Sequence, residues 1–236
     1  MHYLGGKFRV GKQIADFLND LRKSNQSYWE PFVGAAWVLM RIDGKSNYAS
    51  DIHHELIEMW KELQQGWIPP NKVSEEAYSL AKEGFCSPEL TAFIGFGCSW
   101  GGKYFGGYAR DPKSARNYAQ NAKNSLLKKV AQIPPTKFFQ ADYFSFMPPA
   151  KKMLIYCDPP YADTTKYSMT FDHRKFWERC KTLNLSGHTV VVSEYQAPQK
   201  WDCVLEMPTR TDYKSRNNQM IPRIERLFMY KEDKCR

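Results

Sequence analysis

Apolar residues recur along the chain at spacings that predict amphipathic helices. Between Gly11 and Lys23, the residues Ile14, Leu18 and Leu21 follow the i, i+4, i+7 pattern of a helix that packs one face on a core. The same reasoning predicts helices around 56–63, 74–83, 115–132 and 176–183. A further helix is expected over 35–42, where apolar residues follow a glycine turn.

Shorter apolar runs predict strands between these helices. The run Met153–Cys157 is continuously apolar, which is typical of a parallel strand buried on both faces. Further strands are predicted at 28–34, 47–52, 189–192, 203–205 and 227–230. Strands that alternate with helices predict an α/β fold with a doubly wound, mostly parallel sheet, and the late succession of strands predicts an antiparallel edge. Ligands of such sheets bind at the carboxyl ends of the strands.

The stretch 66–135 differs in character from its surroundings. It opens with Trp67-Ile68-Pro69-Pro70, closes with Ile133-Pro134-Pro135, and contains a segment from Gly95 to Gly107 that is rich in glycine and aromatic residues. We therefore expect a small, largely helical inserted domain over residues 66–135. The main domain is expected to combine residues 1–65 and 136–236.

The composition limits the class of protein. A chain of 236 residues is long enough for one sizeable core and a modest insertion, and 42% hydrophobic residues are typical of a globular protein. No apolar run approaches the roughly 20 residues that a membrane helix needs. The N-terminal residues also lack the apolar core of a secretion signal. We expect a soluble, cytoplasmic protein.

The charge is unevenly distributed. The formal net charge is +9, and between Gly101 and Lys137 eight Lys or Arg residues face the single acid Asp111. This distribution favours a polyanionic partner, although a basic face kept for solubility gives the same charge. The six cysteines form no Cys-x-x-Cys pair and show no zinc-ligand spacing with the five histidines, so free buried thiols and no metal site are expected.

The most specific motif is the tetrapeptide Asp158-Pro159-Pro160-Tyr161, which follows the buried strand directly and is called the Asp158 turn below. Its two prolines fix the backbone in a rigid turn that presents carbonyl acceptors. The amino nitrogen of adenine is a poor nucleophile because its lone pair is delocalised into the ring. Hydrogen bonds from this amino group to the Asp158 carboxylate and the Pro159 carbonyl would favour a pyramidal, more reactive nitrogen, with Tyr161 free to stack on the base.

Two further points bear on the Asp158 turn. A base inside a duplex cannot enter it, so this chemistry requires the nucleotide to be flipped out of the helix. The plain alternative is a turn whose prolines only end the strand and whose aspartate caps a neighbouring backbone group.

The chain resembles the Dam-type adenine-N6 DNA methyltransferases, especially their phage and prophage relatives. The likeness spans nearly the whole chain and rests on four motifs in order. These are Tyr3-Leu4-Gly5-Gly6-Lys7, Glu30-Pro31-Phe32-Val33-Gly34-Ala35-Ala36, Ala49-Ser50-Asp51-Ile52, and Tyr156-Cys157 with the Asp158 turn. The order places cofactor motifs first, a target-recognition insert next and the catalytic tetrapeptide last, as in the alpha arrangement of the family. The resemblance implies a Rossmann-like methyltransferase sheet.

The resemblance also implies a binding site for S-adenosyl-L-methionine, with S-adenosyl-L-homocysteine as product. The implied cofactor residues are Tyr3, Lys7, Phe32, Gly34, Asp51, Ile52, Asp142, Tyr143 and Asp158. Local sequence leaves simpler interpretations open, because Lys7 follows a Gly-Gly pair as a surface lysine would, Asp51 also suits a helix cap, and Asp142 suits a turn. The chain departs from the family at Ala36, where a second glycine is common. Alanine is compatible with that position if its φ angle is negative.

The segment from Gly101 to Arg110 interleaves cations, aromatics and glycines and resembles the hairpin region that joins the catalytic and recognition parts of the family. A glycine-rich turn with packed aromatics is the alternative. The expected DNA contacts are Lys103, Tyr104, Arg110, Arg116, Asn117 and Lys123. Lys128 and Lys129 are expected to extend this basic surface.

The implied activity is methyl transfer to the N6 amino group of a flipped adenine in double-stranded DNA. This activity would serve restriction-modification or regulation in a bacterial or phage-infected cell. A monomer is compatible with such an enzyme. Three alternatives stay open: methylation of the N4 amino group of cytosine in DNA, methylation of adenine N6 in RNA, or a DNA-binding relative without catalysis.

Overall fold

The computed structural model describes residues 5–110, 116–161, 171–214 and 220–231. The helices are α1 (Gly11–Leu21), α2 (His54–Gln64), α3 (Glu75–Lys82), α4 (Pro88–Gly97), α5 (Tyr118–Val130) and α6 (His173–Leu185), with two short 3-10 helices, η1 (Leu39–Arg41) and η2 (Trp100–Gly102). The strands are β1 (Tyr28–Glu30), β2 (Asn47–Asp51), β3 (Thr136–Gln140), β4 (Leu154–Cys157), β5 (Thr189–Glu194), β6 (Trp201–Lys214) and β7 (Met220–Tyr230).

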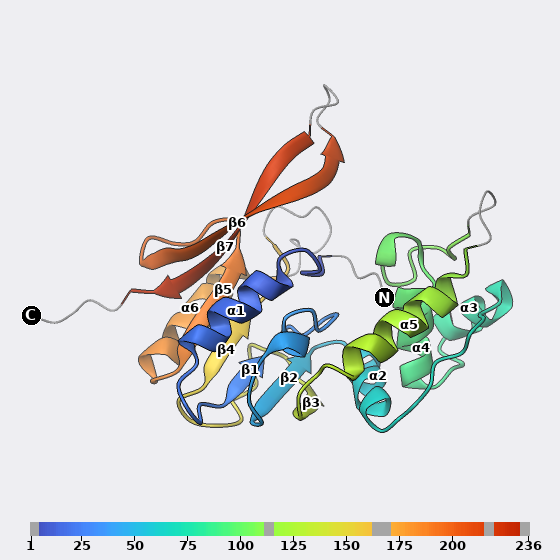
Figure 1. The fold of residues 1–236 in the computed structure, drawn as a ribbon, viewed down its shortest axis with the longest axis horizontal. Coiled ribbons are helices and arrows are strands. Elements are labelled where there is room, and N and C mark those ends of the chain that lie inside the picture. The colour runs from blue at the N-terminus through green and yellow to red at the C-terminus, as the bar shows by residue number, and fades with distance from the viewer. Residues whose placement is uncertain (1–4, 111–115, 162–170, 215–219, 232–236) are drawn as a thin grey trace, which may run out of the picture.

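The strands form one seven-stranded sheet in the order β3-β2-β1-β4-β5-β7-β6 (Figure 1). The strands β1 to β5 pair in parallel, while β7 is antiparallel to both β5 and β6. This arrangement confirms the predicted doubly wound, mostly parallel Rossmann-like sheet with an antiparallel edge. The strand order reverses between β1 and β4, which places the topological switch point at the carboxyl ends of these two strands.

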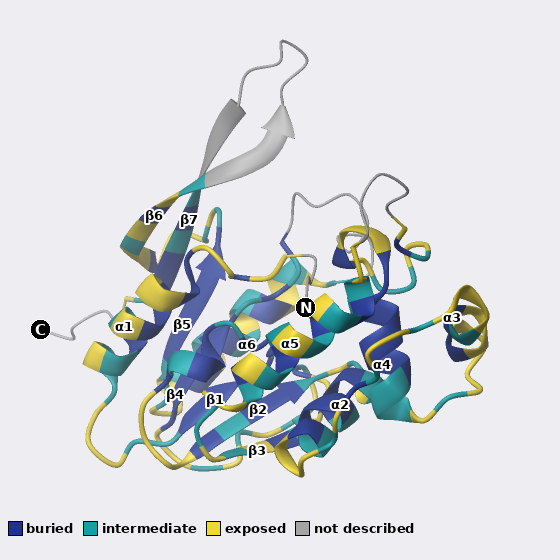
Figure 2. Cartoon of the chain, turned by 45° about the vertical axis from the view of Figure 1, so that its right-hand side comes forward, coloured by how far each residue is buried: buried dark blue, intermediate teal, exposed yellow. Residues whose placement is uncertain are grey.

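The sheet is buried on both faces because its strands carry apolar residues on both sides. On β1, Tyr28 packs in one core with residues of α1, α2, α4 and α5, whereas the next residue, Trp29, packs in a second core with residues of α6. On β4, Tyr156 packs in the first core and Ile155 in the second, because successive side chains of a strand point to opposite faces of the sheet. Figure 2 shows the resulting buried band along the central strands.

The turn after β1 does not continue into the helix predicted over 35–42. Only the 3-10 turn η1 forms there. Gly34 and Ala36 have φ angles of 43° and 55°, and residues in this left-handed region cannot continue a right-handed helix. The prediction of a helix at this position is therefore wrong, and an irregular loop follows β1.

Between α2 and β3 the chain forms α3, α4, η2 and α5, which Figure 1 shows on the β3 side of the molecule. The predicted α3 forms with Ser74 as its N-cap, and the Ser74 hydroxyl accepts a hydrogen bond from the Ala77 N–H. The helix α5 begins at Tyr118, later than predicted, because the Asn117 side chain caps it. The helix α4 was not predicted, since it is apolar around most of its surface and shows no amphipathic stripe.

The predicted thiols are only partly buried. Cys98, Cys157 and Cys180 are free and buried, Cys86 is half-buried, and Cys203 is exposed, which corrects the expectation for that residue. Cys235 lies outside the described residues. Within the described ranges, no helix has the length and apolar character to cross a membrane.

Candidate active site

The Asp158 turn lies at the carboxyl end of β4, directly at the switch point of the sheet. The Asp158 carboxylate forms an ion pair with Lys7, whose Nζ lies 2.7 Å from Asp158 Oδ1. The Asp158 side chain is 18% exposed and the Lys7 side chain 8% exposed. Burial raises the pKa of Asp158 to about 6; the Lys7 ammonium opposes this rise and the nearby Glu225 carboxylate adds to it. Asp158 is thus ionised above about pH 6.

Lys7 belongs to a larger buried network. Its Nζ donates to the Tyr161 hydroxyl and lies 3.7 Å from Glu225 Oε1. The Tyr161 hydroxyl donates to Glu225, and Ser193 Oγ donates to the same Glu225 oxygen at 2.6 Å. Burial works against the charged form of Lys7, but Asp158 and Glu225 overcome it, and the pKa of Lys7 is raised. Lys7 is therefore a buried cation with two acidic neighbours, so its interpretation as a surface lysine is wrong.

Tyr161 contributes its hydroxyl to this network rather than an open ring. The side chain is buried, and its ring lies edge-on against Tyr195 with 4.7 Å between the ring centroids. Stacking of Tyr161 on a base stays a prediction, and it would require the ring to become accessible.

Glu225 and Ser193 were not identified from the sequence. Ser193 lies within a run of buried residues on β5 and carries no motif. Glu225 is 5% exposed and lies two residues before the buried Leu227 on β7, so both point to the same side of the strand. An acidic residue on the inward face of an alternating strand was the signal available for Glu225.

A further carboxylate, Glu30, ends β1 beside this network. It is buried and accepts a hydrogen bond of 2.9 Å from the Tyr28 hydroxyl. Burial raises the pKa of Glu30 well above its usual value, and the neighbouring Asp158 carboxylate acts in the same direction. Burial and the Asp158 charge therefore both favour the neutral form of Glu30.

The loop after β1 is held by backbone hydrogen bonds to Asp51. The Gly34 N–H donates to Asp51 Oδ2 at 3.1 Å, and the His53 N–H donates to Asp51 Oδ1 at 3.1 Å. The Trp60 indole donates to the Gly34 carbonyl at 3.0 Å. Burial raises the pKa of Asp51, while these backbone N–H donors counteract the rise. Asp51 thus joins the glycine loop to the start of α2, and its contact with a ribose stays a prediction.

Ala36 does not meet the condition under which alanine suits this loop. Its φ angle is +55° and it is buried, so the chain holds an alanine in a conformation that favours glycine. Lys129 from α5 supports the same loop, because its Nζ donates to the Ala35 carbonyl at 2.6 Å and lies 3.4 Å from the centre of the Trp37 ring. Burial lowers the pKa of Lys129 to about 7. Lys129 is 1% exposed, so its assignment to the basic surface is wrong.

The other predicted cofactor residues lie around the same carboxyl edge. Phe32 is half-buried, with its ring centroid 5.0 Å from that of Tyr143. Tyr143 is buried and its hydroxyl lies 3.1 Å from Cys180 Sγ. Ile52 is 69% exposed, while Asp142 is exposed and accepts the Phe144 N–H in a turn. Tyr3 lies outside the described residues.

The predicted DNA contacts differ in how far they are exposed. Lys103, Arg110 and Arg116 are exposed, although Arg110 forms an ion pair with Glu75. Tyr104 is half-buried and packs against Phe96, with 4.6 Å between the ring centroids. For Tyr104, the packed ring agrees with the alternative interpretation of this segment as a glycine-rich turn with packed aromatics.

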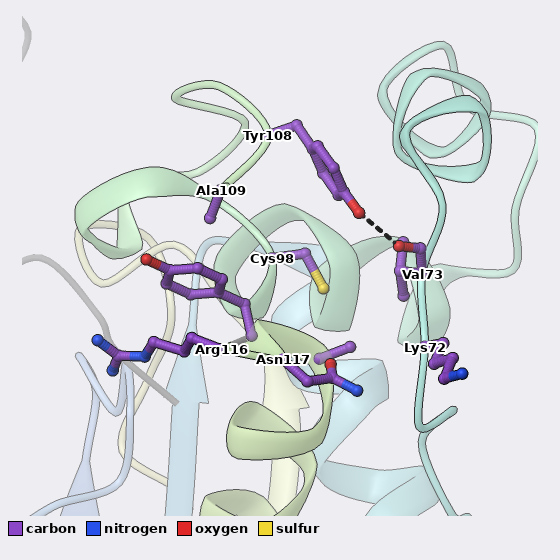
Figure 3. Close-up of a pocket in the computed structure, with 9 residues that line it drawn as sticks. Lys72, Val73, Cys98, Tyr108, Ala109, Arg116 and Asn117 are labelled. Atoms are coloured by element: carbon purple, nitrogen blue, oxygen red, sulfur yellow. Dashed lines mark hydrogen bonds between the residues drawn. The ribbon is translucent and has the colours of Figure 1, made fainter. Parts of the chain in front are cut away.

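Asn117 and Lys123 contact the loop before α3. Asn117 donates to the Asn71 carbonyl at 2.9 Å, and Lys123 donates to Asn71 Oδ1 at 2.7 Å. Asn117 also lines a cavity of about 280 Å³. Figure 3 shows Arg116 and Tyr108 at the same cavity. Their contacts to DNA stay predictions.

A family model described as D12 class N6 adenine-specific DNA methyltransferase matches residues 3–83. The match includes Lys7, Gly34 and Asp51 and ends before the Asp158 turn. No curated protein matches the chain.

Solved structures give distant matches. Thermoplasma acidophilum 1320 is 10% identical with a TM-score of 0.45, over 94% of this chain and 86% of that one. The rRNA methyltransferase aviRa from Streptomyces viridochromogenes is 11% identical with a TM-score of 0.44, over 94% and 84%. The glycopeptide N-methyltransferase MtfA, complexed with S-adenosyl-L-methionine, is 7% identical with a TM-score of 0.37, over 94% and 72%. These values are too low to indicate a substrate. The family match and the strand order support a methyltransferase.

Proposed function

We propose that this protein transfers the methyl group of S-adenosyl-L-methionine to the N6 amino group of a flipped adenine in DNA. The observation that carries the proposal is the position of the Asp158 turn, which lies at the carboxyl end of β4 where the strand order reverses. Ligands of doubly wound sheets bind at this point. The Asp158 carboxylate and the proline-fixed carbonyl after it would form the pair of acceptors for an amino group there.

The residues of the neighbouring strand ends fit the cofactor. Gly34 has no side chain to block the loop after β1, Asp51 supplies a carboxylate at the end of β2, and the exposed Ile52 supplies an apolar surface beside it. These features suit a ribose and an adenine ring. Phe32, with Asp142 and Tyr143, would complete this side of the site. When bound, the cofactor supplies an electrophilic methyl group on a sulfonium.

The residues of the chain would act on the amino group. The Asp158 carboxylate and the Pro159 carbonyl would each accept one hydrogen bond from the amino group. These hydrogen bonds would localise the nitrogen lone pair and stabilise the positive charge that develops during transfer. The new N–C bond forms as the S–C bond breaks, and the methylated nitrogen then loses one proton. Because its pKa is about 6, the Asp158 carboxylate suits the role of proton acceptor.

The segment 66–135 is the proposed target-recognition part, and residues 1–65 with 136–236 are the proposed catalytic part. Exposed cations of the segment support this role, since phosphate contacts supply much of the affinity for DNA. These cations are Lys103, Arg110 and Arg116. Extrusion of the adenine from the duplex belongs to the same proposal.

The deciding experiment incubates the purified protein with tritium-methyl S-adenosyl-L-methionine and either unmethylated DNA or unmethylated RNA. The nucleic acid is then digested and the labelled nucleoside is identified. We expect label in N6-methyladenine from DNA. Label in N4-methylcytosine, label from RNA alone, or cofactor binding without any transfer would each overturn the proposal in favour of one of the three alternatives.

A further inference from the structure

Glu225 on β7 occupies the centre of the polar network around Asp158. Its Oε1 accepts hydrogen bonds from Ser193 Oγ at 2.6 Å and from the Tyr161 hydroxyl, and it lies 3.7 Å from Lys7 Nζ. One buried carboxylate oxygen thus joins the N-terminal loop, the Asp158 turn and β5.

The Lys7 ion pair creates a conflict for the proposed reaction. Lys7 lies 2.7 Å from the carboxylate oxygen of Asp158, and that carboxylate is the proposed acceptor for the substrate amino group. With Asp158 as its sole acid, Lys7 could release it only by leaving a buried charge unpaired, which is costly. Glu225 offers Lys7 a second carboxylate within 3.7 Å, so a small shift keeps the ammonium paired.

The balance of charge in the network also supports a role for Glu225. One ammonium, on Lys7, lies between two carboxylates, on Asp158 and Glu225. When both acids are ionised, the network therefore carries an excess of one negative charge. In a buried site this excess favours the positive charge that develops on an amino nitrogen during methyl transfer.

We propose that Glu225 is a positioning residue that shares Lys7 with Asp158 and so leaves the Asp158 carboxylate able to accept a hydrogen bond from the substrate amino group. This inference rests on the proposed function and adds a residue to its machinery. Glu225 acts through Lys7 and Tyr161 and does not itself contact the substrate.

The pH dependence follows from the groups around Asp158. Burial raises the pKa of Asp158 to about 6, and the Glu225 charge contributes to the rise while Lys7 opposes it. Further titratable neighbours of this network are Glu30, Tyr156, Cys157, Tyr161 and Tyr195. Removing the negative charge of Glu225 should lower the pKa of Asp158, so the ionised form would persist to lower pH.

The test compares wild type with Glu225→Gln, which keeps the shape and an acceptor oxygen but removes the charge. We expect kcat to fall by about a hundredfold, as for the loss of one preorganised electrostatic partner. The KM values for DNA and cofactor should stay within about threefold, because phosphate contacts elsewhere supply much of the affinity for DNA and Glu225 does not contact the cofactor. The acid limb of kcat/KM should move to lower pH. Glu225→Asp, which keeps the charge, should recover part of the rate.

The matched control is Glu206→Gln on the neighbouring strand. Glu206 is 56% exposed and pairs with Arg226, so its replacement removes the same charge from the same hairpin without touching the network. It should leave kcat and the pH profile unchanged. Glu225→Gln with wild-type kcat would overturn the inference. A lower kcat with an unmoved acid limb and a lower melting temperature would also overturn it, since that pattern indicates a structural role alone.

A second measurement separates this inference from the proposed function. The carboxyl carbon of Asp158 is followed by 13C NMR through a pH titration of wild type and Glu225→Gln, and its signal is assigned with Asp158→Asn. A lower pKa in Glu225→Gln supports the shared lysine even if wild type methylates neither DNA nor RNA. An unchanged pKa overturns it even if the wild-type enzyme is fully active.

Discussion

The two strand ends that form the candidate site are built in different ways. At the end of β4, side-chain charges from segments far apart in sequence meet around Asp158, with Lys7 and Glu225 as its ionic neighbours. At the ends of β1 and β2, a short loop is held by backbone hydrogen bonds to Asp51 and by the left-handed conformations of Gly34 and Ala36. The first half depends on ionisation and the second on backbone geometry.

Under the proposed function, we expect this difference to give the two halves separate roles. Substitutions at the end of β4 should change the rate of the chemical step and its pH dependence. Substitutions in the β1 and β2 loops should change cofactor affinity and stability. The following experiments test this division.

The largest effect is expected for Asp158→Ala. Methyl transfer should fall by at least about a thousandfold because the acceptor of the amino group is lost. Lys7 retains Glu225 as a neighbour at 3.7 Å, so the fold and the binding of DNA should persist. Initial rates of tritium transfer and fluorescence anisotropy with labelled DNA measure the two properties. Asp158→Asn, which keeps the shape, should lose similar activity. Wild-type turnover in either variant would remove Asp158 from the mechanism.

A smaller effect is expected for Asp51→Ala. The Gly34 and His53 N–H groups would lose their acceptor, at a cost of about 1–3 kcal/mol. We expect about tenfold weaker cofactor binding, the equivalent of about 1.4 kcal/mol, by isothermal titration calorimetry. Asp16→Ala is the control, because Asp16 is exposed and forms a surface ion pair with Lys12. Equal cofactor affinity in both variants would contradict a role for the Asp51 loop in cofactor binding.

A still smaller effect is expected for Arg116→Ala in the segment 66–135. Affinity for DNA should fall by about threefold to tenfold for all sequences, and the slope of log K against log salt should decrease by about 1. Arg110→Ala should have less effect, since Glu75 already neutralises this charge. Binding isotherms at several salt concentrations compare the two. Unchanged salt slopes would place the DNA surface elsewhere.

The smallest effect is expected for Ala36→Gly. An alanine in the left-handed region costs about 1–2 kcal/mol, which the substitution by glycine would recover. The greater freedom of glycine in the unfolded chain offsets about 0.4–1 kcal/mol of this stabilisation. The variant should therefore melt about 2–4 °C higher. Ala35→Gly, whose φ angle is outside the left-handed region, should melt lower. A lower melting temperature for Ala36→Gly would show that this conformation carries no strain.

The sequence determined much of the architecture. The apolar run Met153–Cys157 identified a buried parallel strand, and the Asp158 turn directly after it was placed at a carboxyl end, as β4 confirms. The amphipathic stripes at α1, α2 and α6 are also present, because a period of 3.6 residues is a local property that burial of one face enforces. Helix α4 was not predicted because it is buried on nearly all sides and therefore shows no alternation of apolar and polar positions.

Only the tertiary structure decided which side chains meet. The partner of Lys7 is Asp158, 151 positions away, and no local pattern specifies such an ion pair. Lys129 is buried because α5 packs on the loop after β1, where its Nζ donates to the Ala35 carbonyl. The positive φ angle of Ala36 belongs to the same loop and likewise has no signal in the local sequence. Hydrophobic periodicity is encoded residue by residue, whereas the state of a buried charge is set by every group that the fold brings near it.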